Sequence, residues 1–125
     1  MDQMTRRLIN PTEMSYAQAH EVTNASRLLF VSGQVPADKD DHVPPDFKSQ
    51  CRLAWANVES QLKAAGMTLD NLVKVTTFLS DRRYRQENYE VRMEVLGERS
   101  PALTVIITGI YDEAWLLEIE AIAAA

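Results

Sequence analysis

Cysteine, glycine and histidine are scarce in this chain of 125 residues, which has one cysteine, four glycines and two histidines. Because Cys51 stands alone, the chain can form neither an internal disulfide framework nor a cysteine-rich zinc site. No apolar run approaches the ~20 residues that span a bilayer, so no membrane partner is expected. The opening residues, MDQMTRRLIN, lack the apolar segment of a secretion signal.

Positive charge is also in short supply. The chain has 13 Lys and Arg against 18 Asp and Glu, a net charge of −5, which argues against nucleic acid as a partner. Its 46% hydrophobic and 25% charged residues are typical of an ordinary globular protein. The length fits one domain, assigned to residues 1–125. These counts predict a soluble, cytoplasmic, single-domain protein.

Several well-known catalytic motifs are missing. The sequence has no Walker loop, G-x-G-x-x-G, H-E-x-x-H or G-x-S-x-G, so phosphate-binding loops, zinc proteases and hydrolase nucleophile elbows are not indicated. The two histidines, His20 and His42, lie far apart in the sequence. No ligand spacing supports a metal site built from them with Asp40 or Asp41, and no bound metal is predicted.

Hydrophobic patterning predicts six strands and two helices. The first helix begins at the N-cap Asp46 and stops at Gly66, and the second follows Asp81 and is closed by Gly97. The acidic, proline-rich stretch 36–45 is predicted to be a solvated loop. Strands are expected over residues 7–9, 17–22, 27–32, 72–79, 102–108 and 115–123, and helices over 46–66 and 82–96. The apolar stripe of the first helix comprises Phe47, Cys51, Ala54, Val58, Leu62 and Ala65.

The predicted order, β-β-β-α-β-α-β-β, indicates an α+β fold with a mostly antiparallel sheet and two helices on one face. Two helices cover only one sheet face, yet the segments LLFV, TVII and WLLEI carry apolar residues on both faces. A monomer would therefore expose a larger apolar patch than soluble monomers tolerate. We expect other copies of the chain to cover the free face.

Two carboxylates on the last strand are candidates for chemistry. Glu118 and Glu120 share one strand face with apolar neighbours, where a carboxylate is costly unless paired or functional. For either glutamate, an ion pair or a position at the rim of the sheet explains the carboxylate as well as a functional role does. Cys51 lies on the apolar stripe of the first helix, which favours a buried structural thiol over a nucleophile. Position alone indicates turn, cap or surface roles for Tyr16, Ser32 and Asn88.

A series of short strings in a fixed order carries a resemblance to a known family. They are SGQVP at 32–36, NV at 57–58, AAG at 64–66, VKVTTFL at 73–79, Asp81, Asn88, PA at 101–102 and EIEAIA at 118–123. In this order and spacing, over nearly the whole chain, they resemble the Rid family of reactive intermediate deaminases, formerly called YjgF.

The resemblance implies a chorismate-mutase-like fold that assembles as a homotrimer around a central barrel, with a small-molecule cleft at each subunit interface. It implies hydrolysis of imines or enamines to a 2-keto acid and ammonia, with no metal or organic cofactor. By the same resemblance, Glu118 holds or activates the attacking water. Tyr16, Ser32, Gly33 and Asn88 line the cleft. An imine carbon is already electrophilic once its nitrogen is protonated, so the protein needs mainly to orient the substrate and shuttle one proton.

The sequence departs from the deaminating members at the strand that follows Pro101. Those members carry an arginine that clamps the substrate carboxylate, and here Leu103 occupies that position. Val105 replaces a frequent cysteine and makes this wall of the cleft more apolar. Leu103 and Val105 are thus ligand-binding candidates that disfavour a simple 2-imino acid.

Three outcomes follow from this departure. The protein hydrolyses an imine or enamine with no α-carboxylate or with its acid group elsewhere, another arginine substitutes, or the cleft binds a metabolite without turning it over. The candidate arginines are expected to form a solvated helix face instead; they are Arg82, Arg83, Arg85, Arg92 and Arg99. Endoribonuclease activity, the older family label, is disfavoured by the acidic balance and the scarcity of histidine. The sequence neither supports nor excludes a regulatory protein-binding role.

Overall fold

A computed structural model describes residues 3–125 and contains six strands and two α-helices in the predicted order. The strands are β1 (Thr5–Pro11), β2 (Ala17–Thr23), β3 (Leu28–Gln34), β4 (Leu72–Leu79), β5 (Ala102–Ile107) and β6 (Leu117–Ala124). The helices are α1 (Phe47–Ala64) and α2 (Arg85–Leu96). Predicted and observed strand ends differ by one or two residues, which is ordinary where strands fray.

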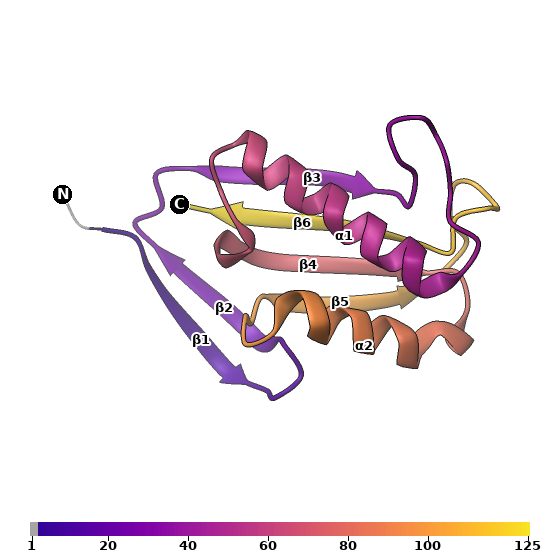
Figure 1. Ribbon diagram of the computed structural model, residues 1–125. Coiled ribbons are helices and arrows are strands. Elements are labelled where there is room, and N and C mark those ends of the chain that lie inside the picture. The colour runs from indigo at the N-terminus through magenta and orange to yellow at the C-terminus, as the bar shows by residue number, and fades with distance from the viewer. Residues whose placement is uncertain (1–2) are drawn as a thin grey trace.

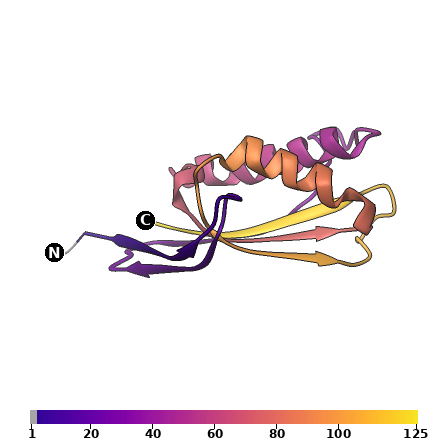
Figure 2. The same ribbon diagram turned by 90° about the horizontal axis from the view of Figure 1, so that it is seen from below.

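The six strands form one sheet in the order β1-β2-β5-β4-β6-β3. Neighbours are antiparallel except for the pairs β2–β5 and β4–β5, which are parallel. Both helices lie on the same face of the sheet, which Figure 2 shows from the side. The hairpin of β1 and β2 runs at an angle to the other four strands (Figure 1). The predicted α+β fold with two helices on one face is therefore confirmed.

Helix α1 begins and ends where the sequence predicts. The Asp46 side chain accepts a hydrogen bond from the backbone nitrogen of Ser49 at 3.0 Å and so caps the first turn. At the other end, Gly66 adopts a φ of +72°, a left-handed conformation that suits glycine after a helix.

Helix α2 starts later than predicted. Asp81 caps a single 3-10 turn, Arg82–Tyr84, by accepting a hydrogen bond from the backbone nitrogen of Arg83, and the α-helix begins only at Arg85. The tighter turn places the Tyr84 ring flat against Phe47 of α1, with ring centroids 4.7 Å apart. This stacking across the two helices accounts for the difference, because a tertiary contact determines the geometry of the first turn.

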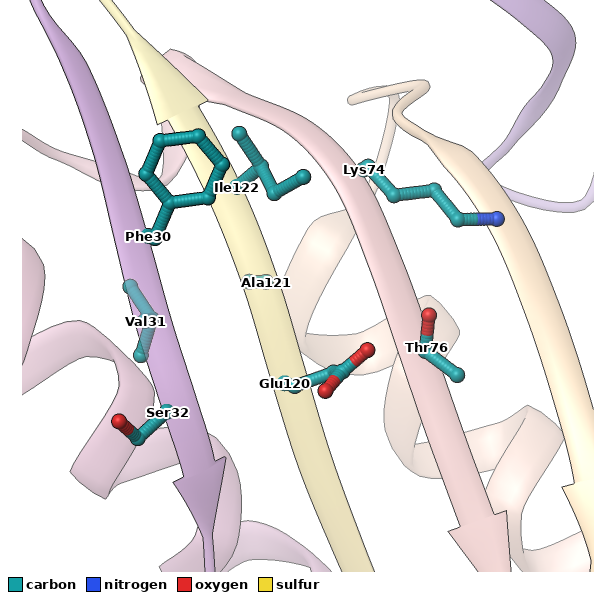
Figure 3. Close-up of a pocket in the computed structure, with 8 residues that line it drawn as sticks. All are labelled: Phe30, Val31, Ser32, Lys74, Thr76, Glu120, Ala121 and Ile122. Atoms are coloured by element: carbon teal, nitrogen blue, oxygen red, sulfur yellow. The ribbon is translucent and has the colours of Figure 1, made fainter.

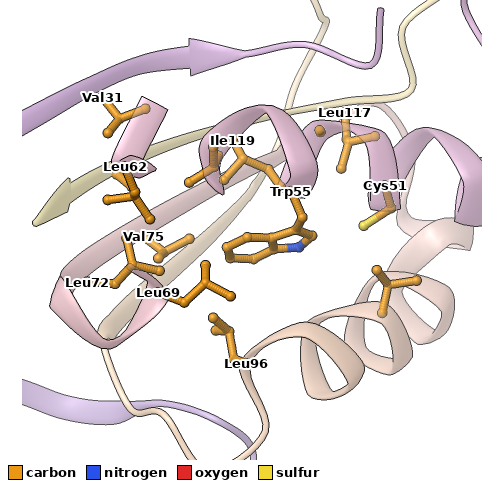
Figure 4. Close-up of a cluster of buried hydrophobic side chains, with 14 of the residues drawn as sticks. Val31, Cys51, Trp55, Leu62, Leu69, Leu72, Val75, Leu96, Leu117 and Ile119 are labelled. Atoms are coloured by element: carbon orange, nitrogen blue, oxygen red, sulfur yellow. The ribbon is translucent and has the colours of Figure 1, made fainter. Parts of the chain in front are cut away.

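The core lies between the helices and the covered face of the sheet (Figure 4). Cys51, Ala54, Val58 and Leu62 of the predicted stripe are fully buried, and Trp55 fills the space beside them. Two details differ from the predicted stripe, because Trp55 was not assigned to it and Ala65 is only half-buried. On β6 the side chains that face the helices are buried at alternate positions; they are Leu117, Ile119, Ala121 and Ala123.

The opposite face of the sheet carries no helix and exposes large apolar side chains. Phe30 is 70% exposed and Leu28 is 61% exposed, and Ile106 on β5 is 40% exposed. These side chains share the uncovered face with Glu118 and Glu120 of β6. No helix formed by residues 3–125 has the length and apolar character needed to cross a membrane.

Two polar side chains of α1 hold the adjoining loops in place. The Asn57 amide donates to the carbonyls of Val35 and Ala37, at 2.8 and 3.0 Å, and so anchors the start of the loop 36–45. Buried Gln50 donates to Pro44 and Ala114. The same side chain accepts a hydrogen bond from the backbone nitrogen of Leu116. These contacts position the loop beyond β3 and the loop before β6, and the second of these loops borders a hollow together with Glu118.

Candidate functional site: two clusters on opposite sheet faces

A bulge in β3 brings Gly33 against Glu118. Val31 pairs with Ala121 and Gln34 with Ile119, so Ser32 and Gly33 together stand opposite a single residue of β6. A Cβ atom on Gly33 would overlap the Glu118 carboxylate. Glycine is therefore needed at position 33 for the carboxylate to occupy its place on the open face. We call Ser32, Gly33 and Glu118 the glutamate cluster.

Hollows flank the glutamate cluster on the open face. One, of about 210 Å³, is bordered by Ser32, Phe30 and Glu120, and Figure 3 shows the Glu120 carboxylate extending toward Thr76. Another, of about 420 Å³, is bordered by Glu118 itself together with Phe78 and Tyr111. Glu118 is half-buried, whereas Glu120 is exposed. The two carboxylates therefore face different surroundings although they lie on one strand face.

Asn88 and Val105 belong to a second cluster, on the covered side of the sheet. They line a cavity of about 660 Å³ between α2 and the end of β4, which we call the α2 cavity. Asn88 is buried, and its side-chain oxygen lies 3.9 Å from the Cys51 sulfur. Tyr16, immediately before β2, is half-buried near Arg92. The remaining residues that line the cavity are Met14, Leu79, Arg82, Arg83, Arg85, Gln86, Tyr89 and Arg92.

Leu103 and Val105 point to the same face of β5 but have different surroundings. Leu103 pairs with Val75 and packs against the apolar core. Val105 is 39% exposed and borders the α2 cavity. Leu103 thus sits beside the cavity wall without forming part of it.

The two clusters lie on opposite faces of the sheet. Glu118 is in register with Phe78 on the open face, whereas Val105 is in register with the adjacent Thr77 on the covered face. A single copy therefore does not bring Glu118 to the α2 cavity. Within residues 3–125, β5 pairs with β2 only at Ala102, which leaves the rest of its outer edge free for another chain.

Arg92, one of the arginines considered above as a substitute for the one missing at Leu103, lines the α2 cavity. It is only 7% exposed, in contrast to the solvated helix face predicted for the arginines. Burial lowers the pKa of its guanidinium, and the nearby Tyr16 and Tyr89 oppose that shift. Asn88 and Arg92 carry the signal, because they lie four positions apart on α2 and both fall on the side that faces the sheet. Arg99, by contrast, pairs with Asp70 at 2.7 Å.

Of the remaining candidates, Cys51 meets the second cluster at Asn88, and the two histidines lie apart from both clusters. Cys51 is fully buried, as predicted, and burial raises the pKa of its thiol to about 12. His20 on β2 lies 3.0 Å from the carbonyl of Ser100, and His42 is exposed beside Asp38. No group of three or more His, Cys, Asp or Glu side chains between residues 3 and 125 is arranged to hold a metal ion.

The fold defines a class of small α+β proteins in which two helices pack on one face of a six-stranded sheet. The family described as "Endoribonuclease L-PSP" matches residues 9–125, and the chain belongs to this family, which is also known as the YjgF or Rid family. A solved structure of the Rid protein YyfB from Yersinia pestis shares the fold, with a TM-score of 0.83 at 23% identity over 96% of this chain and 98% of that one.

Two relatives extend the comparison. The RutC family protein PH0854 of Pyrococcus horikoshii is 36% identical over 110 residues, which cover 86% of this chain and 85% of that protein. The Escherichia coli protein named "Putative reactive intermediate deaminase TdcF" is 30% identical over 100 residues, covering 77% of this chain and 78% of that one. A crystal structure of TdcF with bound serine has a TM-score of 0.74 at 26% identity, and the match covers 95% of this chain and 98% of TdcF.

Proposed function

We propose that this protein is a deaminase-type hydrolase of imines or enamines that uses no metal or organic cofactor. Support comes from its family, from the deaminase name of its relative TdcF, and from the carboxylate of the glutamate cluster. The observation that carries the proposal is the approach of Gly33 to Glu118, because the missing side chain is what leaves room for a carboxylate there.

Glu118 is the proposed catalytic residue. In this reaction the substrate nitrogen is protonated, which makes the imine carbon electrophilic. Glu118 orients a water molecule and accepts its proton while the water oxygen bonds to that carbon. Glu118 passes that proton to the nitrogen. The carbon–nitrogen bond then breaks while the new hydroxyl group gives its proton to Glu118, so that ammonia leaves and a carbonyl compound is the other product. An enamine enters the same sequence after it takes up a proton on carbon and becomes the imine.

The site is proposed to be assembled from two copies of the chain. Glu118 and the α2 cavity lie on opposite faces of one copy, while the open face exposes Phe30, Leu28 and Ile106. Packing this apolar face against the free edge of β5 in another copy would cover it and join the clusters. We propose a cytoplasmic homotrimer with a ligand cleft at each interface, where Tyr16, Ser32, Gly33, Asn88 and Val105 contact the ligand.

The substrate is proposed to differ from a simple 2-imino acid. Leu103 has no hydrogen-bond donor to offer a carboxylate and packs into the core instead. Although the family description contains the word endoribonuclease, we do not propose that activity for this chain. Its net charge is −5, and its two histidines lie apart from both clusters.

A coupled assay tests the proposal. An amino-acid oxidase or an amine oxidase generates imines with and without an α-carboxylate, and the decay of each is followed with and without the protein. We expect faster decay of at least one imine and slower turnover by about 100-fold or more in Glu118→Gln. Glu120→Gln is the matched control, since it neutralises a glutamate on the same strand face and should change the rate by only a few-fold.

The result also separates an enzyme from a binding module. If the wild-type protein accelerates no imine while it binds a member of the same panel, the cleft is a metabolite-binding site without turnover. Equal losses in Glu118→Gln and Glu120→Gln would show that the general charge of the face matters and that Glu118 has no specific role.

A further inference from the structure

Arg92 is a buried cation without an acidic partner. Its Nε atom is buried and has no hydrogen-bond partner. Its Nη2 atom donates one long hydrogen bond, of 3.4 Å, to the carbonyl of Met14. The guanidinium carbon lies 5.4 Å from the centre of the Tyr89 ring. No carboxylate in residues 3–125 lies within 4.0 Å of this guanidinium.

Other arginines of the chain show how unusual this arrangement is. Arg7 pairs with Glu21, and Arg52 with Glu94, through two hydrogen bonds in each case, and all four side chains lie at the surface. Arg92 is more buried than Arg7 and Arg52, and it makes fewer hydrogen bonds than either of them. Burying a charged guanidinium is costly unless hydrogen bonds and an opposite charge compensate for its lost hydration. A bound anion would supply both.

The α2 cavity around Arg92 is strongly basic. Three further arginines line it, whereas no Asp or Glu does; the four are Arg82, Arg83, Arg85 and Arg92. Acidic residues outnumber basic ones in the whole chain by 18 to 13, so this collection of positive charge runs against the overall composition. Arg82, Arg83 and Arg85 are exposed and can attract an anion toward the opening. Arg92 lies deepest among them.

We infer that the α2 cavity binds a small organic acid and that the Arg92 guanidinium holds its carboxylate. A guanidinium presents parallel N–H groups that match the two oxygens of a carboxylate. Leu79 and Val105 provide an apolar wall for the rest of the ligand. As a statement about substrate, this rests on the proposed function: the imine or enamine carries an acid group that is held from α2 and not from β5.

Binding of acids and their neutral amides tests this inference. Acetate, 2-oxobutanoate, 4-oxopentanoate and phenylacetate are each titrated against the full-length protein, alongside the corresponding amide, with calorimetry or NMR as the readout. We expect at least one acid to bind about tenfold to a hundredfold more tightly than its amide, as a charged hydrogen-bonded pair allows. That preference should disappear in Arg92→Gln and Arg92→Met. Arg7→Gln, which removes the same charge at an exposed arginine of β1 outside the cavity, is the control and should leave the preference unchanged.

Stability separates a ligand-binding role from a structural one. If Arg92 is kept for a ligand, Arg92→Met removes a buried unpaired charge, and the unfolding midpoint of the ligand-free protein stays the same or rises. A fall in that midpoint together with an unchanged acid preference in Arg92→Lys and Arg92→Gln would assign Arg92 a structural role and overturn the inference. So would the absence of any acid preference in the wild-type protein.

The two proposals fail separately. Glu118→Gln should keep or increase the preference for acids, because it removes a negative charge from the other cluster. If no imine is turned over but an acid binds through Arg92, the proposed function is wrong and the anion site stands. If neutral imines alone are hydrolysed and no acid is preferred, the anion site is wrong and the proposed function stands.

Discussion

The covered and open faces of the sheet are built from the same strands but have different surroundings. On β6, Ile119 is fully buried beneath the helices, whereas Ile122 lies half-buried on the open face beyond Glu120. On the covered face, side chains from α1 and the sheet complete a core. On the open face, apolar side chains remain exposed beside carboxylates. The comparison teaches that the covered face carries the core that holds the chain in its fold, with the α2 cavity at its edge, whereas the open face leaves apolar and acidic side chains exposed.

Shortening one isoleucine on each face of β6 is expected to give the largest contrast. Ile119→Ala leaves a cavity in a closed core and should lower the free energy of unfolding by about 2–5 kcal/mol. Ile122→Ala should instead act through assembly, so its loss of stability should depend on protein concentration. Denaturant unfolding at several concentrations measures both. Equal losses that are independent of concentration would mean that the faces do not differ in this way.

A charge on the open face sharpens the comparison further. Phe30→Glu should shift the proposed trimer to a monomer at micromolar concentration, since Phe30 is 70% exposed and the charge would have to be buried on assembly. Sedimentation velocity measures the change. Ala56→Glu, an equal change in charge at an exposed position of α1, is the control and should leave the assembly unchanged. A wild-type monomer under these conditions would contradict the trimer.

Gly33→Ala tests the bulge on the open face. The new methyl group would occupy the place of the Glu118 carboxylate, which would have to rotate away. We expect turnover to fall about tenfold or more through the misplaced carboxylate, with little change in the unfolding midpoint. The coupled imine assay and thermal unfolding give the two readings. A large loss of stability with unchanged turnover would show that Gly33 serves the fold and not the carboxylate.

Titration of Cys51 is the smallest expected effect and belongs to the covered face. Burial raises the pKa of the thiol to about 12 from 9.0, so the folded protein keeps a proton that the unfolded chain releases. Stability must therefore fall as pH rises above the unfolded pKa. Between pH 8 and 10 the wild-type protein should lose about 1.4 kcal/mol more than Cys51→Ala. Parallel curves for the two proteins would mean that the thiol ionises equally in both states.

Local patterns were sufficient to predict the order of the elements. The sequence showed that Glu118 and Glu120 share one face of β6, and Asp46 and Gly66 marked the ends of α1, because these signals depend on residues close in sequence. Trp55 and the 3-10 turn before α2 were missed because contacts between the two helices determine them. The bulge at Ser32 and Gly33 depends likewise on how β3 pairs with β6.

The candidate site could be predicted only in part. The resemblance pointed to Glu118, Gly33 and Asn88, but the positions in the chain do not reveal that the clusters lie on opposite faces of the sheet. Arg92 was assigned to a solvated helix face because four arginines within eleven residues read as an exposed charged surface. Its burial follows from the packing of α2 over the sheet, which a single sequence does not display.

Mixing two inactive variants tests most directly whether one copy's Glu118 acts on a ligand held in the α2 cavity of another. Glu118→Gln and Asn88→Leu are refolded separately and together, and imine turnover is compared. In randomly mixed trimers each interface has both intact clusters about one time in four, so the mixture should regain about a quarter of wild-type turnover. A mixture that forms mixed trimers and stays as inactive as its parts would contradict a site shared between copies.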